Sequence, residues 1–446
     1  MAGPVSNATH ALEDALAIRR RTLTLAILTA TYFFSYMDRQ ILAILQEAIK
    51  ADLQLSDTQL GILSGLAFAI FYATLGIPVA RLADRTSRKG IIAVALTLWS
   101  AMTALCGIAQ NFLQLLIFRI GVGIGEAGSS PPSHSIIADL YPPERRASAM
   151  AVYSLGVVLG AASGTAIGGT VAHFYGWRVA MFAVGIPGIL LALIVLAFVV
   201  EPRRGLSDAQ IAVDQGAMPS VGSSFSAMWH NRAARHLVIG VTLTSMIGYG
   251  HSAWGPSFMQ RSLGIEVIQI SWYIAPFAAL AGTLSGIGGG KIADRLVPGR
   301  GLYMQAWLVA VLKTIALPFS LIFYFVDVPS FALTGYFISI LFASSYLGPS
   351  FALIQGLAPL RMRAMWAAVT LFVINLVGLG LGPTLAGIIS DALVPIVGQE
   401  SLRWSMVVFA AATPWAIFHY WRAGVALKAS HADGTGPATT GSAATA

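Results

Sequence analysis

The chain has 446 residues, of which 56% are hydrophobic and only 10% are charged, whereas soluble domains carry about 25% charged residues. Together with a mean hydropathy of +0.74, this composition excludes a water-soluble protein and indicates a membrane protein with several spans. The net charge of +8 does not indicate a nucleic acid partner, because most Lys and Arg residues fall on one side of the predicted topology, the positive-inside bias of membrane proteins. The single cysteine, Cys106, excludes intramolecular disulfides and cysteine metal clusters.

The first segment, residues 1–21, ends in Arg19, Arg20 and Arg21 directly before a long apolar run. No small-residue cleavage site follows a short apolar stretch, so we expect a retained first helix rather than a cleaved signal. The basic residues place this segment and the other terminus in the cytoplasm. We therefore expect a multi-pass integral protein of a bacterial inner (cell) membrane, surrounded by the lipid bilayer.

Apolar runs of about 20 residues or more, the length that a membrane-crossing helix needs, predict twelve transmembrane helices. Their approximate bounds are 22–45, 58–81, 90–109, 113–137, 147–171, 177–200, 235–258, 266–290, 302–326, 330–356, 364–391 and 402–423. Residues 201–234 split these helices six and six, and we expect them to form a flexible cytoplasmic linker with a short interfacial helix at about 225–229. Residues 424–446 are expected to form a disordered cytoplasmic tail.

Two independent matches between the halves indicate an internal duplication. The hexapeptide Ala-Arg-Leu-Ala-Asp-Arg at 80–85 recurs as Gly-Lys-Ile-Ala-Asp-Arg at 290–295, and a pattern of Pro, Ser and Arg at 132–147 recurs at 349–364. This duplication predicts two pseudo-symmetric six-helix bundles, residues 22–200 and 235–423, with a substrate site at mid-depth between them.

Residues 81–89, Arg-Leu-Ala-Asp-Arg-Thr-Ser-Arg-Lys, resemble the signature loop of the major facilitator superfamily, with Ala80 and Ser87 where that pattern has glycine. Tyr-Met-Asp-Arg at 36–39 and the glycine-rich segment 119–127 resemble the Spinster family within it. The resemblance implies an all-α integral membrane fold of the major facilitator type and a transporter rather than an enzyme. Members of the Spinster family export lysolipids and sphingosine phosphates, and proton coupling has been proposed for them.

Four charged residues lie inside apolar runs, where each charge costs roughly 2.5 to 3.5 kcal/mol: Asp38, Arg39, Arg119 and Glu126. Such residues are expected to face the protein interior and to pair. Arg119 and Glu126 share one helix face but lie roughly 10 Å apart along the axis, so groups of the first helix are needed to bridge them.

Two interpretations of this cluster remain open: a fixed set of ion pairs that joins the first and fourth helices, or a proton-coupling site. We favour proton coupling, because the second half carries Tyr336 and Ala343 at the positions equivalent to Arg119 and Glu126, so the fold does not require the charges. Protonation of Asp38 or of Glu126 releases an arginine, which can then accept an anionic headgroup. The proton is the expected coupling ion, and no cofactor is expected.

The loop after the second helix resembles the gating cluster of the superfamily. Asp84, Arg85 and Arg88 form it, and Asp294 and Arg295 repeat the arrangement in the second half. The alternative is a plain turn with solvated charges.

Polar and aromatic residues of the second half are candidates for contact with the solute, although polar contacts between helices explain them about equally well. They are Tyr249, His251, Trp254, Ser344, Ser345, Tyr346 and Asn375. Lys313 is expected to extend its amine toward the membrane surface. The interiors of the seventh, eighth, tenth and eleventh helices hold no Lys or Arg, which favours an amphipathic solute over a small hydrophilic one.

ATP hydrolysis is excluded, because Ile292 follows the glycine-rich segment 286–291 where a P-loop needs Ser or Thr. The sequence thus predicts a proton-coupled secondary active transporter that exports an amphipathic anionic solute, such as a lysolipid or a sphingosine phosphate, by alternating access. A transporter of small hydrophilic organic anions or of drugs is the alternative. We expect a monomer.

Overall fold

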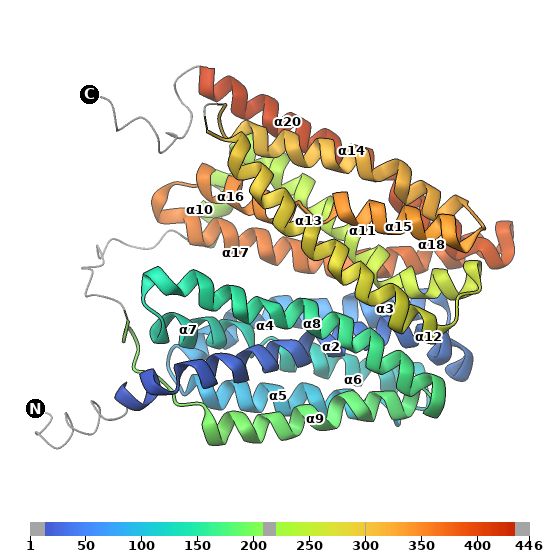
Figure 1. Cartoon of the computed structure of the whole chain (residues 1–446), viewed down its shortest axis with the longest axis horizontal. Coiled ribbons are helices and arrows are strands. Elements are labelled where there is room, and N and C mark those ends of the chain that lie inside the picture. Colours follow the sequence, from blue (N-terminus) through green and yellow to red (C-terminus); the bar gives the residue numbers. More distant parts are fainter. Residues whose placement is uncertain (1–13, 208–219, 299, 433–446) are drawn as a thin grey trace, which may run out of the picture. The chain divides into compact units, whose positions relative to one another are not determined.

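The computed structural model describes residues 14–207, 220–298 and 300–432, which are almost entirely helical (Figure 1). Nine helical stretches of this part are long and apolar enough to cross a membrane. The last of them, Met365–Ser430, has 66 residues and is long enough for two crossings. Two further long helices, α2 (Arg21–Leu53) and α11 (Arg232–Leu263), carry more polar residues. Together these stretches account for the twelve predicted spans.

The described part of the chain forms two compact units. Within the described ranges, the first unit comprises residues 14–55, 66–207 and 266–275, and the second comprises residues 56–65, 220–265, 276–298 and 300–432. Relative to the predicted bundles, 22–200 and 235–423, each unit therefore gains one short segment from the other half of the sequence.

In the first unit, α2 packs along α8, and α5 packs along α9 and α6. Its helices are α2, α4 (Leu66–Ala83), α5 (Arg88–Cys106), α6 (Phe112–Glu126), α7 (Ser130–Leu140), α8 (Pro143–Tyr175), α9 (Trp177–Phe198), α12 (Val267–Gln269) and the π-helical turn η1 (Ile270–Ile274).

In the second unit, α11 and α14 both pack against α20, and α3 packs against α18. Its helices are α3 (Asp57–Ser64), α10 (Val221–His230), α11, α13 (Ala275–Leu296), α14 (Tyr303–Phe325), α15 (Pro329–Ala343), α16 (Leu347–Leu357), α17 (Arg363–Val373), α18 (Gly382–Val397), α19 (Ser401–Ala411) and α20 (Thr413–Ala432), with the short turns η2 (Leu360–Met362), η3 (Ile374–Leu381) and η4 (Gly398–Glu400).

Several predicted spans are broken in the structure. The second span divides at Gly65 into α3 and α4, and the fourth divides into α6 and α7. The eleventh contains the π-helical segment η3, whose sequence Ile-Asn-Leu-Val-Gly-Leu-Gly-Leu includes two glycines. Such breaks are tolerated at membrane depth where neighbouring helices satisfy the freed backbone groups.

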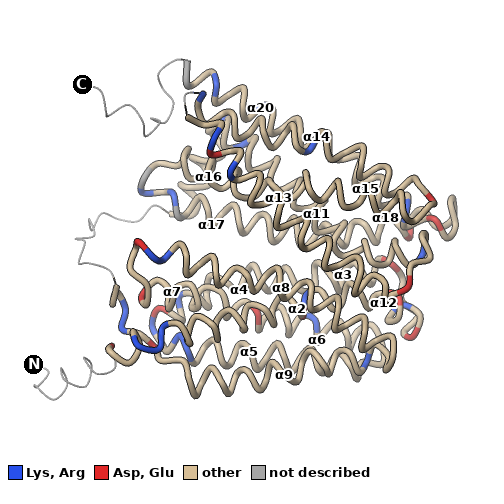
Figure 2. Tube along the Cα trace, in the orientation of Figure 1, with Lys and Arg blue, Asp and Glu red and all other residues tan. Residues whose placement is uncertain are grey.

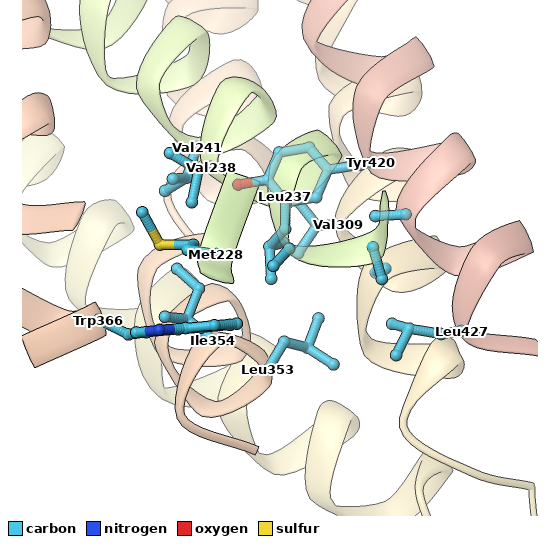
Figure 3. Close-up of a cluster of buried hydrophobic side chains, with 14 of the residues drawn as sticks. Met228, Leu237, Val238, Val241, Val309, Leu353, Ile354, Trp366, Tyr420 and Leu427 are labelled. Carbon is cyan, nitrogen blue, oxygen red and sulfur yellow. The ribbon is translucent and has the colours of Figure 1, made fainter. Parts of the chain in front are cut away.

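A buried apolar cluster, which we call the α20 core, lies within the second unit (Figure 3). It joins residues of α10, α11, α14, α16, α17 and α20, among them Met228, Val309 and Tyr420. Leu427 is 4% exposed and belongs to it, so residues 424–432, predicted to be disordered, continue α20 as a helix that is held by apolar packing. The remaining residues of the predicted tail, 433–446, lie outside the described residues.

The expected interfacial helix forms as α10, in which the exposed rings of Phe225 and Trp229 stack with centroids 5.9 Å apart. Residues 208–219 of the predicted linker and residues 1–13 of the first segment lie outside the described part.

Candidate functional site

The first ion pair of the charged cluster joins Asp38 of α2 to Arg119 of α6. Arg119 Nη1 donates to Asp38 Oδ1 over 3.0 Å, and the Thr103 hydroxyl of α5 donates to Asp38 Oδ2. Asp38 and Arg119 are each 2% exposed. Both carboxylate oxygens of Asp38 thus have a partner inside the unit.

The second ion pair joins Arg39 to Glu126. Arg39 Nε and Nη2 each lie 2.7 Å from Glu126 Oε2, and the hydroxyl of Ser35 donates to the same oxygen over 2.7 Å. The other oxygen, Oε1, is buried and has no hydrogen-bond partner among the described residues. Glu126 therefore concentrates its contacts on one oxygen and leaves the second unsatisfied, unlike Asp38.

Aromatic rings surround the guanidinium of Arg39. Its Cζ lies 4.9 Å from the ring centroid of Tyr36, 4.7 Å from that of Phe68 and 4.5 Å from that of Tyr72. These distances permit cation–π attraction, which strengthens when water is excluded. Arg39 thus has two kinds of partner, the rings and the Glu126 carboxylate, and its side chain is 15% exposed.

Close helix contacts place these groups. A Cβ at Gly123 of α6 would lie 2.6 Å from the carbonyl oxygen of Phe68, and a Cβ at Gly164 of α8 would lie 2.5 Å from that of Met37. Neither contact accommodates a side chain, so α4 approaches α6 and α8 approaches α2 only through glycine. Successive residues of a helix point about 100° apart, which lets Asp38 and Arg39 reach different partners.

The cluster is balanced when both acids are ionised, because each arginine has one carboxylate partner. Arg119 and Glu126 are bridged through α2 rather than to one another. Pairing offsets the desolvation of these charges, whereas loss of one partner leaves an uncompensated buried charge.

The loop residues lie in two different environments. Arg88 is 1% exposed and pairs with Asp139 and with Glu201, whose Oε1 lies 3.2 Å from Arg88 Nε. Burial raises the pKa of Glu201, but hydrogen bonds from Ser87 and Arg88 and the charge of Arg88 outweigh it, so the pKa of this carboxyl lies below its ordinary value.

The other gating candidates are exposed. Asp84 forms a long ion pair of 3.8 Å with Arg204 of the same unit. Arg85, Asp294 and Arg295 form no ion pair with any residue in the described part of the chain.

The candidates of the second half are scattered within the second unit. Trp254 is fully buried, and its Nε1 donates to the carbonyl of Pro383 over 2.9 Å, a contact that joins α11 to α18. Ser345 bonds to Ser285 of α13. The Tyr346 hydroxyl lies 3.1 Å from Ser245 Oγ, and the ring centroid of His251 lies 5.3 Å from that of Tyr324. Tyr249 packs against the α20 core, Ser344 is the residue that ends α15, and Asn375 lies in η3.

Sequence reasoning missed the uncharged partners of the cluster, Ser35, Phe68, Tyr72 and Thr103. Ser35 lies one helical turn before Arg39, a spacing that signals a shared face. The rings carry no such signal, because aromatic residues one turn apart are common in membrane helices. Asp139 and Glu201, the partners of Arg88, were also missed. No group of three or more His, Cys, Asp and Glu side chains in the described ranges is arranged to hold a metal ion.

The sequence matches the model of the Major Facilitator Superfamily over residues 28–383. It is 34% identical over 398 residues to an MFS-type efflux pump of Mycolicibacterium smegmatis, a match that covers 88% of this chain and 90% of the relative. A probable L-galactonate transporter of Escherichia coli is 24% identical over 291 residues and is matched over 63% of each chain. The crystal structure of a bacterial homolog of the human lysosomal transporter Spinster, in an inward-facing and unoccupied conformation, has a TM-score of 0.84 at 30% identity and covers 91% of this chain and 97% of its own.

Proposed function

Because this chain belongs to the major facilitator superfamily, a family of non-enzymatic secondary transporters, we propose that it is a proton-coupled transporter that exports an amphipathic anionic solute, with Glu126 as the proton acceptor. The observation that carries this proposal is the arrangement of the Glu126 carboxylate. It is buried at 1% exposure, it holds Arg39 through Oε2 alone, and its Oε1 has no partner among the described residues. Oε1 is therefore the free position for a proton.

Protonation of Glu126 changes the charge of the cluster from zero to +1. The ion pair with Arg39 then weakens, while the rings of Tyr36, Phe68 and Tyr72 still hold the guanidinium at 4.5–4.9 Å. The proton thus produces a positive group that remains inside the unit, and an anionic solute binds best in that state. Solute and proton occupancy are coupled in this way without direct contact between them.

Asp38 serves a different role in this proposal. Both of its oxygens have partners, Arg119 and Thr103, and Arg119 is almost inaccessible. We assign the Asp38–Arg119 pair to positioning, because it fixes α2 against α5 and α6 in the register that presents Arg39 to Glu126.

The positive-inside bias supports cytoplasmic termini. In Figure 2 the charged segments gather toward the ends of the helices, and the intervening stretches are largely uncharged. We assign Asp84, Arg85, Arg88, Asp294 and Arg295 to conformational gating on the cytoplasmic side.

Similarity to an efflux pump and to a Spinster homolog supports export of an amphipathic solute. A second candidate, transport of small hydrophilic organic anions, is favoured by the similarity to a probable L-galactonate transporter. A panel of lysolipids, sphingoid phosphates and sugar acids in proteoliposomes separates the two.

The coupling is tested in proteoliposomes with an imposed pH gradient. Glu126→Gln is expected to abolish gradient-driven accumulation of the solute while retaining solute exchange at equal pH. Glu144→Gln is the matched control, since Glu144 is an exposed residue in the first turn of α8. Unchanged gradient dependence in Glu126→Gln would overturn the assignment.

A further inference from the structure

Lys313 lies near the middle of a membrane-crossing helix and on its inward face. It is ten residues after the start of α14 at Tyr303, or about 15 Å along the axis, and twelve before its end at Phe325. Val309, one turn earlier, and Ala316, one turn later, are 1% and 2% exposed, so Lys313 continues a buried stripe. Val309 belongs to the α20 core shown in Figure 3.

The ammonium of Lys313 is held by an aromatic ring. Its Nζ lies 4.8 Å from the ring centroid of Tyr346, at the start of α16, and the Tyr346 hydroxyl is 3.1 Å from Ser245 Oγ of α11. A cation–π contact stabilises the ammonium but does not neutralise its charge.

No acid in the described part of the second unit neutralises Lys313. Asp57 pairs with Arg261, Asp327 and Glu400 both pair with Arg403, Asp391 accepts from the backbone N–H groups of Asp57 and Thr58, and Asp294 is exposed near the end of α13. Lys313 itself forms an ion pair with none of the described residues. Lys313 differs in this from Arg39 and Arg119, which each have a carboxylate partner.

We propose that Lys313 and Tyr346 form a binding site for the oxyanion headgroup of the solute within the second unit. The ammonium attracts the anionic oxygens of the headgroup, and the ring of Tyr346 holds the ammonium in place. This inference rests on the proposed transport function and deepens it. It places the headgroup at the one mid-helix cation that no described acid compensates, rather than at Arg119.

Binding of two probes to the purified protein, at one pH and without a gradient, tests this site. The probes are 1-oleoyl-lysophosphatidic acid and 1-oleoylglycerol, which share the chain and glycerol but differ in the phosphate. Lys313→Met is expected to weaken binding of the lysophosphatidic acid at least about tenfold and to leave oleoylglycerol unchanged, whereas Lys313→Arg retains binding of the anion. Lys428→Met is the matched control, because Lys428 also lies over aromatic rings, those of Tyr303 and Trp307, but near the end of α20.

Wild-type affinity of Lys313→Met for the lysophosphatidic acid would overturn the proposal, and so would an equal loss of both probes. Loss of the anion in Lys313→Arg as large as in Lys313→Met would also contradict it, because the charge would then not matter. Since no gradient is applied, the result is independent of coupling through Glu126: failure of the Glu126→Gln test leaves this site standing, and failure here leaves proton coupling standing.

Discussion

Arg39 contacts Glu126 through a single carboxylate oxygen, with Nε and Nη2 both 2.7 Å from Oε2. The neighbouring pair uses its acid differently, since Asp38 shares its two oxygens between Arg119 and Thr103. A pair of arginine and carboxylate therefore occurs twice in one unit, once with an unpaired carboxylate oxygen and once without. We base on this difference the proposal that Glu126 changes protonation and that Asp38 holds the helices in place.

The positioning role of Asp38 predicts a large loss of stability when its charge is removed. Asp38→Asn leaves the buried guanidinium of Arg119 without a counter-charge, and we expect the free energy of unfolding in mixed micelles to fall by about 3–5 kcal/mol. The double variant Asp38→Asn with Arg119→Leu is expected to recover part of this loss, because no charge remains unpaired. A stability of Asp38→Asn equal to that of the wild type would show that the pair does not hold the helices.

The site at Arg88 predicts a pH-dependent stability. The pKa of Glu201 is lowered in the folded protein, so its contribution is fully present above the ordinary carboxyl range and is lost as the pH falls through the lowered value. Melting temperatures of the wild type and Glu201→Gln should therefore differ by a constant amount from neutral pH to about pH 5 and converge on further acidification. A gap that widens with acid would mean that the carboxyl acts in its protonated form.

Gly65, between α3 and α4, predicts a position-specific effect of one methyl group. A Cβ at Gly65 would lie 2.4 Å from the carbonyl oxygen of Gly380 and 2.7 Å from Thr384 Oγ1, whereas a Cβ at Gly76 of α4 would meet nothing within 4 Å. Gly65→Ala is expected to destabilise the protein by about 1–3 kcal/mol, and Gly76→Ala by less than about 0.5 kcal/mol, as measured by unfolding in mixed micelles. Similar values for the two variants would contradict the packing of α3 against α18.

The sequence was sufficient for the fold, because twelve long apolar runs and a duplicated loop restrict the possible architectures severely. The run predicted at 177–200, for example, is the helix Trp177–Phe198. It did not reveal the break at Gly65, since the glycine is explained by a neighbour more than 300 residues away, the carbonyl of Gly380.

The four charged residues of the cluster could also be chosen from the sequence, because each charge is costly in an apolar run. The sequence could not show which acid pairs with which arginine. Asp38 and Arg39 are adjacent on α2, and which of them meets Arg119 and which meets Glu126 depends on how α2 lies against α6. The partner of Lys313 could not be predicted for a related reason: its contact with the ring of Tyr346 joins α14 to the start of α16 and depends on how these helices pack.

The most direct test of the account is infrared difference spectroscopy of the protonation state of Glu126. On acidification of the membrane-reconstituted protein, we expect a carbonyl band of a protonated carboxyl group that disappears in Glu126→Gln and persists in Asp38→Asn. The same band in Glu126→Gln, or no pH-dependent carboxyl band in the wild type, would show that Glu126 does not carry the proton.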